Sequence, residues 1–200
     1  MKTPIISYKN DPQLKIYFIR EIEKHRKADA IVQGTYGKEN GVWRGCAVAC
    51  SLRSLAILDG ETLKESYSDH KLYESKLGIP EWLAYLEDRI FEGLPKKDAK
   101  RWPTQFARAV PVGVNLESVR WHFSSFLMKE NIERVQKLRI EESLKNQILT
   151  AIQQVLALHE NAIITGVWAE SAAASAAWSA AASAAASAAS AAESAASAAW

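Results

Sequence analysis

The sequence predicts an all-α protein, in which an irregular multi-helix domain precedes a long Ala/Ser-rich C-terminal helix. Apolar side chains recur at helical spacing in most segments, and strand-like runs are confined to residues 31–32 and 162–165. Residues 171–200 contain only Ala, Ser, Trp and Glu. We therefore expect a helical globular domain over residues 1–165 and a helical low-complexity tail over residues 166–200.

Turn and capping residues place the expected helices in order. Asp11 and Pro12 are typical of a helix start, so the first helix is expected over residues 13–30. Four glycines indicate a loop over residues 34–45, and Gly78 and other Gly or Pro residues punctuate the later segments. The further helices are expected at residues 46–58, 69–77, 81–91, 104–109, 116–129 and 132–159.

The tail has a helical rhythm of its own. Its serines recur every three or four residues among alanines, which are the strongest helix formers. At about 100° per residue, Trp168, Trp178 and Trp200 project toward one edge of the tail. A helix with almost no charge tends to bury its surface, so we expect these tryptophans to contact another helix of the same or a neighbouring chain. A solvated spacer is the alternative.

Two cysteines four residues apart carry the clearest chemical signal. Cys46 follows Gly45 at an expected helix start, where the helix dipole favours a thiolate. With His70 as base and Glu74 as the group that orients it, Cys46 would form a catalytic set. Alternatively, Cys46, Cys50, His70 and Glu74 would together bind zinc. A third interpretation makes both cysteines small buried core residues.

Three carboxylates share one face of the helix expected at residues 81–91. Glu81, Asp88 and Glu92 follow helical spacing, opposite an apolar face that contains Trp82 and Leu86. Carboxylates spaced in this way can bind a divalent ion or transfer protons. We expect them instead to face solvent and to bind no ion.

Charge and composition exclude several classes of protein. The 25 Lys and Arg nearly balance the 23 Asp and Glu and are interleaved with them, which argues against a nucleic-acid partner. The sequence contains no strongly apolar run of membrane-spanning length. It also begins without an apolar leader and has only two cysteines, so we expect a cytoplasmic protein with reduced thiols. No cofactor motif is present, and zinc is the one alternative.

Several motifs resemble an uncharacterised family of bacterial and phage proteins. They are the Gly-Cys-x3-Cys segment at residues 45–50, the Leu-Gly-Ile-Pro segment at 77–84 and the Glu-Asp-x-Ile-Phe-Glu-Gly-Leu-Pro segment at 87–95. The Ala-Val-Pro-Val-Gly run at 109–113 and the Ala/Ser/Trp-rich tail also resemble that family. The resemblance implies that residues 45–50 and 78–95 belong to one module, and it implies no activity.

These observations favour association over catalysis. We expect a non-enzymatic, soluble helical protein that binds itself or another helical protein through its Ala-rich, Trp-edged tail. The alternative is a cysteine-dependent enzyme or a metal-binding module centred on Cys46, Cys50, His70 and Glu74.

Overall fold

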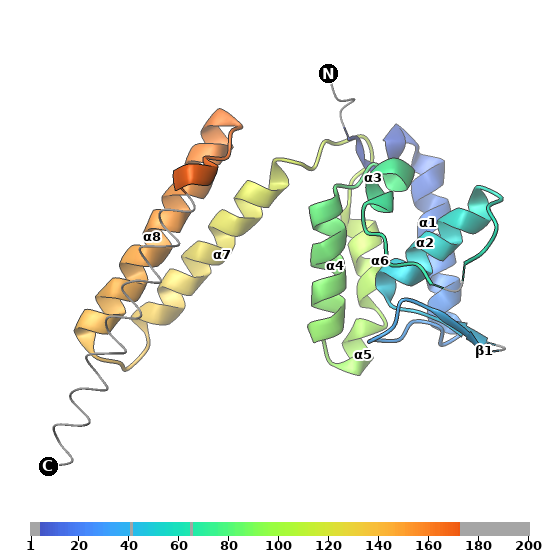
Figure 1. The fold of residues 1–200 in the computed structure, drawn as a ribbon, viewed down its shortest axis with the longest axis horizontal. Coiled ribbons are helices and arrows are strands. Elements are labelled where there is room, and N and C mark those ends of the chain that lie inside the picture. Colours follow the sequence, from blue (N-terminus) through green and yellow to red (C-terminus); the bar gives the residue numbers. More distant parts are fainter. Residues whose placement is uncertain (1–4, 41, 65, 173–200) are drawn as a thin grey trace, which may run out of the picture. The chain divides into compact units, whose positions relative to one another are not determined.

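The computed structural model describes residues 5–40, 42–64 and 66–172 and has an all-α fold (Figure 1). Within these residues the one sheet is a two-stranded hairpin. The all-α prediction is thus confirmed, whereas most of the expected tail helix lies outside the described residues. The chain divides into two compact units, Met1–Glu117 and Ser118–Trp200, which we call the N-terminal and the C-terminal unit. The expected boundary between a domain over residues 1–165 and a tail over residues 166–200 stays a prediction, because most of that tail lies outside the described residues.

Short helices build the N-terminal unit. In chain order its elements are η1 (Ser7–Asn10), α1 (Pro12–Lys27), β1 (Lys38–Asn40), β2 (Val42–Arg44), α2 (Ala47–Leu58), α3 (Leu72–Leu77), α4 (Glu81–Gly93), α5 (Lys96–Ala99) and α6 (Trp102–Ala109). The Asp11 carboxylate accepts from the backbone N–H of Gln13 and caps α1 as expected. Gly78 ends α3 at φ 63°, and a Cβ there would lie 1.8 Å from the carbonyl oxygen of Ile6. Only glycine fits this position.

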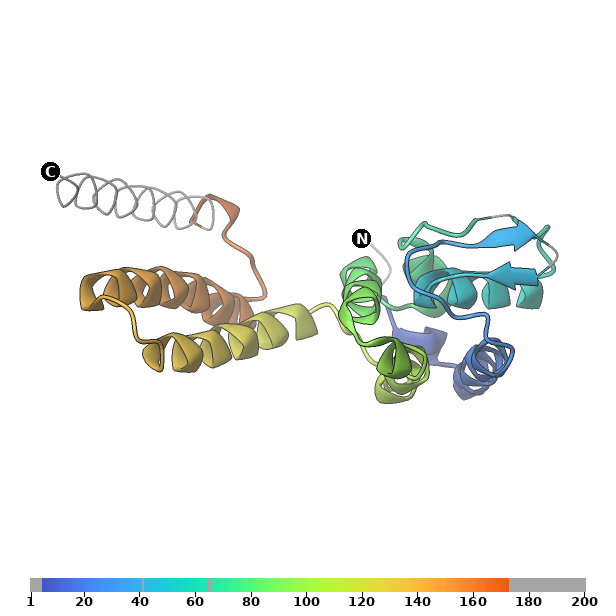
Figure 2. The same ribbon diagram turned by 90° about the horizontal axis from the view of Figure 1, so that it is seen from below.

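The hairpin occupies the segment that we expected to be an irregular loop. Strands β1 and β2 pair antiparallel, and Gly45 forms a parallel bridge with Ile31. Figure 2 shows both strands beside α2. Each strand has only three residues, too few for an alternating pattern to show in the sequence. Conversely, residues 162–165, which we expected to be strand-like, end a helix.

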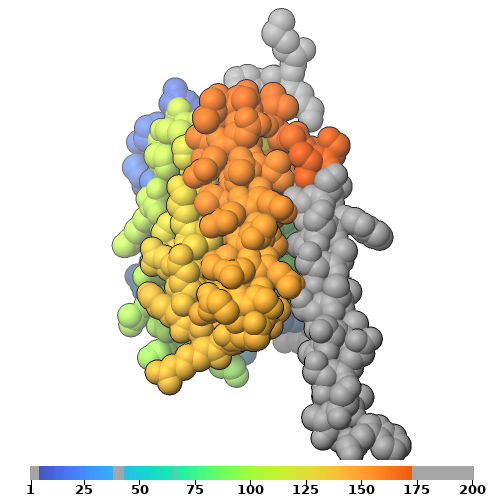
Figure 3. Space-filling model, turned by 90° about the vertical axis from the view of Figure 1, so that its left-hand side faces the viewer, coloured from blue at the N-terminus to red at the C-terminus, as the bar shows by residue number. Residues whose placement is uncertain are grey.

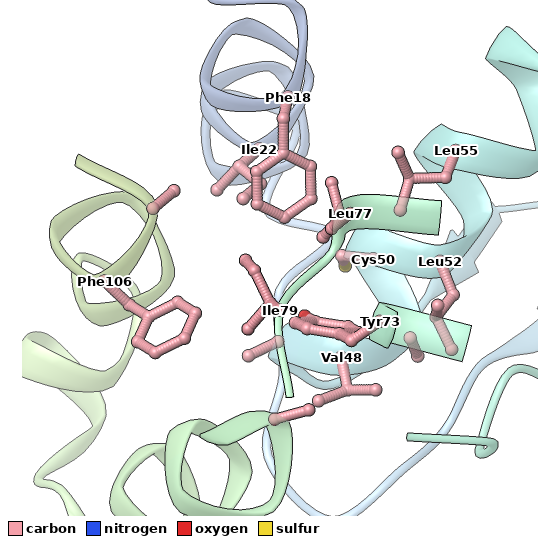
Figure 4. Packing of buried hydrophobic residues seen from close by; sticks show 14 of the residues in the cluster. Phe18, Ile22, Val48, Cys50, Leu52, Leu55, Tyr73, Leu77, Ile79 and Phe106 are labelled. Carbon is pink, nitrogen blue, oxygen red and sulfur yellow. The ribbon is translucent and has the colours of Figure 1, made fainter. Parts of the chain in front are cut away.

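The core lies where α1, α2, α3 and α6 meet (Figure 4). Phe18 and Ile22 from α1, Leu55 from α2 and Phe106 from α6 all lie in this interior. All four side chains are buried, as is Cys50. Phe18 and Ile22 are four residues apart on α1, so helical spacing in the sequence predicts the buried face of that helix.

The first and last segments of the N-terminal unit are joined by hydrogen bonds, which we call the terminal clasp. The backbone N–H of Ser7 donates to the carbonyl of Val114 at 2.9 Å, and that of Gly113 donates to the carbonyl of Ser7 at 3.0 Å. The buried Tyr8 hydroxyl donates to the carbonyl of Ala107 at 2.7 Å. The clasp therefore closes the unit around its core.

Two long helices form the described part of the C-terminal unit. Helices α7 (Val119–Gln136) and α8 (Glu142–Thr165) run side by side (Figure 3). We expected the break between helices near residue 130, but it lies at residues 137–141. The Glu141 carboxylate caps α8 by accepting from the backbone N–H groups of Ser143 and Leu144. Helix α7 runs through residues 129–132 without a break.

Candidate functional site

Cys46 lies at the expected start of α2 but in a buried setting. Its sulfur accepts from the backbone N–H of Ala49 at 3.4 Å, so Cys46 is the N-cap residue of the helix. Only 1% of the residue is exposed. Burial raises the pKa of the thiol, and this effect outweighs the backbone N–H groups that lower it. The thiol therefore stays protonated, which does not favour a catalytic nucleophile.

His70 lies just before α3, with both ring nitrogens engaged. Nδ1 lies 2.9 Å from the carbonyl oxygen of Ser68, and Nε2 lies 3.3 Å from Oδ2 of Asp88. A carbonyl only accepts, so Nδ1 carries a proton. The ring also stacks on Tyr85, with 4.1 Å between the ring centroids. Through its contacts with Asp88 and Tyr85, His70 connects the segment before α3 to helix α4.

Asp88 is the residue that joins the cluster, and sequence reasoning missed its role. Its carboxylate accepts from the Tyr36 hydroxyl at 3.3 Å, and it faces both His70 and the Cys46 thiol. Burial opposes its charge, but the hydrogen bonds from His70, Cys46 and Tyr36 outweigh burial and lower its pKa. We define the Asp88 cluster as Tyr36, Cys46, His70 and Asp88.

The expectation that Asp88 faces solvent was wrong, because only 8% of the residue is exposed. Glu92, by contrast, is exposed, and its carboxylate accepts from the backbone N–H of Gly34. The sequence does contain a signal for the burial of Asp88. Ala84 and Phe91 are apolar residues one helical repeat apart, and a face that contains both also includes residues 87 and 88.

Glu74 does not take the orienting position that we expected for it. Its Oε1 accepts from the backbone N–H of Glu81 at 3.1 Å, so it supports the start of α4. Asp88 contacts His70 instead. Of the candidate catalytic set, the structure therefore brings Cys46 and His70 to one carboxylate and places Glu74 elsewhere.

Cys50 has neighbours different from those of Cys46. Its thiol donates to the carbonyl oxygens of Gly45 at 3.4 Å and Ala30 at 3.7 Å, and burial raises its pKa. In the part of the chain that the structure describes, no three His, Cys, Asp or Glu side chains form a group that could hold a metal ion. The zinc hypothesis therefore gains no support from the geometry.

Glu87 is a second buried carboxyl group on α4. Its Oε2 accepts from the Tyr73 hydroxyl at 2.8 Å, while the buried Oε1 has no hydrogen-bond partner among the described residues. Burial raises the pKa of Glu87 to about 8. At neutral pH this carboxyl group is therefore mostly protonated and uncharged.

The C-terminal unit contains an aromatic stack that includes one of the predicted interaction residues. Trp168 lies parallel to Trp121 of α7, with 4.9 Å between ring centroids and 7° between the planes. The ring of His159 from α8 lies 4.8 Å from Trp168. The chain after α8 is thus fixed to both helices. The other two predicted interaction residues, Trp178 and Trp200, lie outside the described residues.

Much of the apolar surface of this unit is exposed. Ser125 is the one buried residue of α7, and Ala162 is the one buried residue of α8. Phe126 is 56% exposed and Ile164 is 83% exposed. None of the described helices has both the length and the apolar composition that a membrane crossing requires.

Comparisons with family models, curated proteins and solved structures found no match for this chain. The family resemblance of residues 45–50 and 77–95 therefore stays a prediction.

Proposed function

We propose that this protein acts by association and that its C-terminal unit pairs with a second copy of the chain. The observation that carries the proposal is the almost complete lack of buried residues in α7 and α8. A helix is stable in water when its apolar face packs against another element. Two helices side by side leave much of that face uncovered, and further helices would cover it.

One stripe of α7 is suited to such packing. Val119, Phe123 and Phe126 follow the i, i+4, i+7 spacing of a single helix face. Val119 and Phe126 are exposed, and Phe123 is half-buried. On α8, Glu160 is the one charged residue after Lys145, so little charge has to be removed from water when this helix packs.

The charges of the two helices leave little to oppose pairing with a second copy. Helix α7 has one more basic than acidic residue, and α8 has one more acidic than basic residue. Lys129 of α7 already forms an ion pair with Glu160 of α8 within the chain, so a second copy would be held mainly by its apolar side chains. The tail supports the proposal through its composition, because Ala and Ser allow close approach of helices and Trp178 offers a large apolar area.

The test compares the mass of the full chain with that of a variant. Sedimentation of the 22.2 kDa chain over a range of concentrations should reveal a dimer. The substitution Phe126→Glu should raise the dissociation constant of the dimer about tenfold or more, because the new carboxylate places a charge in the proposed interface. Ile16→Glu is the matched control, since Ile16 lies on α1 and is 57% exposed, against 56% for Phe126.

Two outcomes would contradict the proposal. If the chain stays monomeric at every concentration, it does not pair with a second copy of itself. Binding to a different helical protein would then have to be sought. An equal loss of association in Ile16→Glu would show that the α7 stripe is not the interface.

A further inference from the structure

Helix α8 carries two apolar stripes that point in different directions. The first α8 stripe has seven-residue spacing and consists of Leu149, Leu156 and Ile163. The second α8 stripe has the same spacing and consists of Ile148, Val155 and Ala162. Each residue of one stripe is adjacent in sequence to a residue of the other, so the two stripes lie about 100° apart around the helix. A helix with so wide an apolar face packs against two neighbours.

Helix α7 packs on the side of the first α8 stripe. Glu160 is four residues after Leu156, so the two share one side of α8. The Glu160 carboxylate lies 2.9 Å from Nζ of Lys129 on α7. Among the described helices, α7 is the one that packs along α8. Ile148 and Val155 of the second α8 stripe are only half-buried, so there is apolar surface for a further neighbour to cover.

The chain after α8 turns back on the side of the second α8 stripe. Gly166 ends α8 in the left-handed region, at φ 70°. Trp168 then packs on His159, with 4.8 Å between the ring centroids, although His159 precedes the last residue of α8 by six positions. His159 is four residues after Val155 and shares its side of α8. Residues 170–172 are again helical, so a new helix begins just after this contact.

We propose that the tail, whose residues 173–200 lie outside the described residues, docks as a helix along the second α8 stripe of its own chain and runs antiparallel to α8. Its length permits this. At about 1.5 Å per residue, the 28 residues would span about 42 Å, against about 36 Å for the 24 residues of α8. Its Ala and Ser side chains allow a close approach of the two helices. The docking uses α8 rather than the α7 stripe and does not require the proposed dimer.

The position of Trp168 determines which tail tryptophan would meet α8. In antiparallel helices, each residue forward along one helix corresponds to one residue back along the other. Trp178 is ten residues after Trp168, so it would come level with the residue ten positions before His159, next to Ile148. Trp200 is 32 residues after Trp168, but α8 extends only 17 residues back from His159. Trp200 would therefore lie beyond α8.

Amide hydrogen exchange of the full-length chain tests the docking. Trp178→Ala should speed exchange in the first half of α8 by about tenfold or more, because it removes a large apolar contact there. Trp200→Ala is the matched control, since it changes the same residue type beyond the reach of α8. If exchange of α8 in Trp178→Ala equals that of wild type, or if both variants accelerate it equally, the proposal is wrong.

A second pair of variants tests α8 itself. Val155→Glu places a charge on the second α8 stripe and should speed exchange of the tail amides about tenfold or more, while circular dichroism checks that α8 stays helical. Gln154→Glu is the control, because Gln154 is adjacent and exposed. An equal effect of both variants on the tail would overturn the proposal.

Phe126→Glu separates this docking from the proposed dimer. The tail amides of Phe126→Glu should stay as protected as those of wild type at every concentration, because the docking is within one chain. A monomeric wild-type chain with a protected tail would support the docking and contradict the dimer. Loss of tail protection on dilution, or in Phe126→Glu, would place the tail on a second copy and overturn docking within one chain.

Discussion

Glu87 and Asp88 are adjacent on α4, yet their surroundings shift their pKa values in opposite directions. Burial raises the pKa of Glu87 to about 8 although Tyr73 donates to it. Asp88 is also buried, but hydrogen bonds from His70, Cys46 and Tyr36 lower its pKa. The depth of burial and the number of donors together decide which carboxyl group is charged at neutral pH.

Glu87 should make the stability of the N-terminal unit depend on pH. An unfolded glutamate ionises near its ordinary pKa of 4.5, whereas the folded group stays protonated up to about 8. Folding therefore takes up a proton between these values, and the free energy of unfolding falls as pH rises through this range. The expected slope is up to about 1.4 kcal/mol per pH unit. Urea unfolding from pH 5 to pH 8 measures it.

Glu87→Gln should remove most of this slope, because an amide keeps the shape of the neutral acid without ionising. Asp98→Asn is the control, since Asp98 is exposed on α5 and should leave the slope unchanged. If wild-type protein and Glu87→Gln show the same pH dependence, Glu87 is not the group that takes up the proton.

Cys46 should behave as a capping residue rather than as a nucleophile. Cys46→Ser keeps an N-cap acceptor for Ala49 and a donor for Asp88, so its free energy of unfolding should stay within about 1 kcal/mol of wild type. Cys46→Ala loses both contacts and should cost about 1–2 kcal/mol. Chemical denaturation gives this ranking. A serine variant less stable than the alanine variant would contradict the capping role.

At the scale of elements, helix ends were predictable where the sequence marks them. Gly78 and Pro80 separate α3 from α4, and we expected that boundary from the sequence. The turn between α7 and α8 has no glycine or proline, so its place depends on the Glu141 cap. The β1–β2 hairpin was missed because three-residue strands depend on tertiary contacts, such as the burial of Trp43.

The aromatic stack should stabilise the junction between α8 and the chain that follows. Trp168→Ala removes the contacts with Trp121 and His159, and each aromatic pair contributes about 1 kcal/mol beyond its buried area. Amide hydrogen exchange in the last turns of α8 should therefore become faster. Val167→Ala is the control, because Val167 is adjacent and 66% exposed. Equal protection in Trp168→Ala and wild type would show that the stack contributes nothing.

At the scale of the whole molecule, the two units differ in how they bury apolar side chains. The N-terminal unit has a core that draws on most of its helices. The C-terminal unit has long helices with one buried residue each among those described. Folding of the first unit is explained by its own contacts. The second unit leaves apolar side chains uncovered, and this difference is the reason for proposing an association partner.

The candidate site was predictable in its residues but not in its connections. Sequence reasoning selected Cys46 and His70, and the structure brings both to one cluster. It assigned Glu74 to His70 because the two residues are one helical turn apart, but His70 precedes α3. Asp88 comes from a different helix, and only the packing of α4 on the segment before α3 reveals that contact. Spacing within one helix predicts which residues share a face of that helix. It does not predict which residues of other elements contact that face.

The terminal clasp determines how late in synthesis the N-terminal unit can close. Tyr8 and Ala107 are separated by 99 positions, so the ribosome releases one partner long before the other. Contacts between distant positions form late and slow the folding of a domain. The helices of the nascent chain can form early, but the closed N-terminal unit exists only after residue 114 has emerged. A truncated product that ends before residue 107 leaves the Tyr8 hydroxyl without its acceptor and the core open.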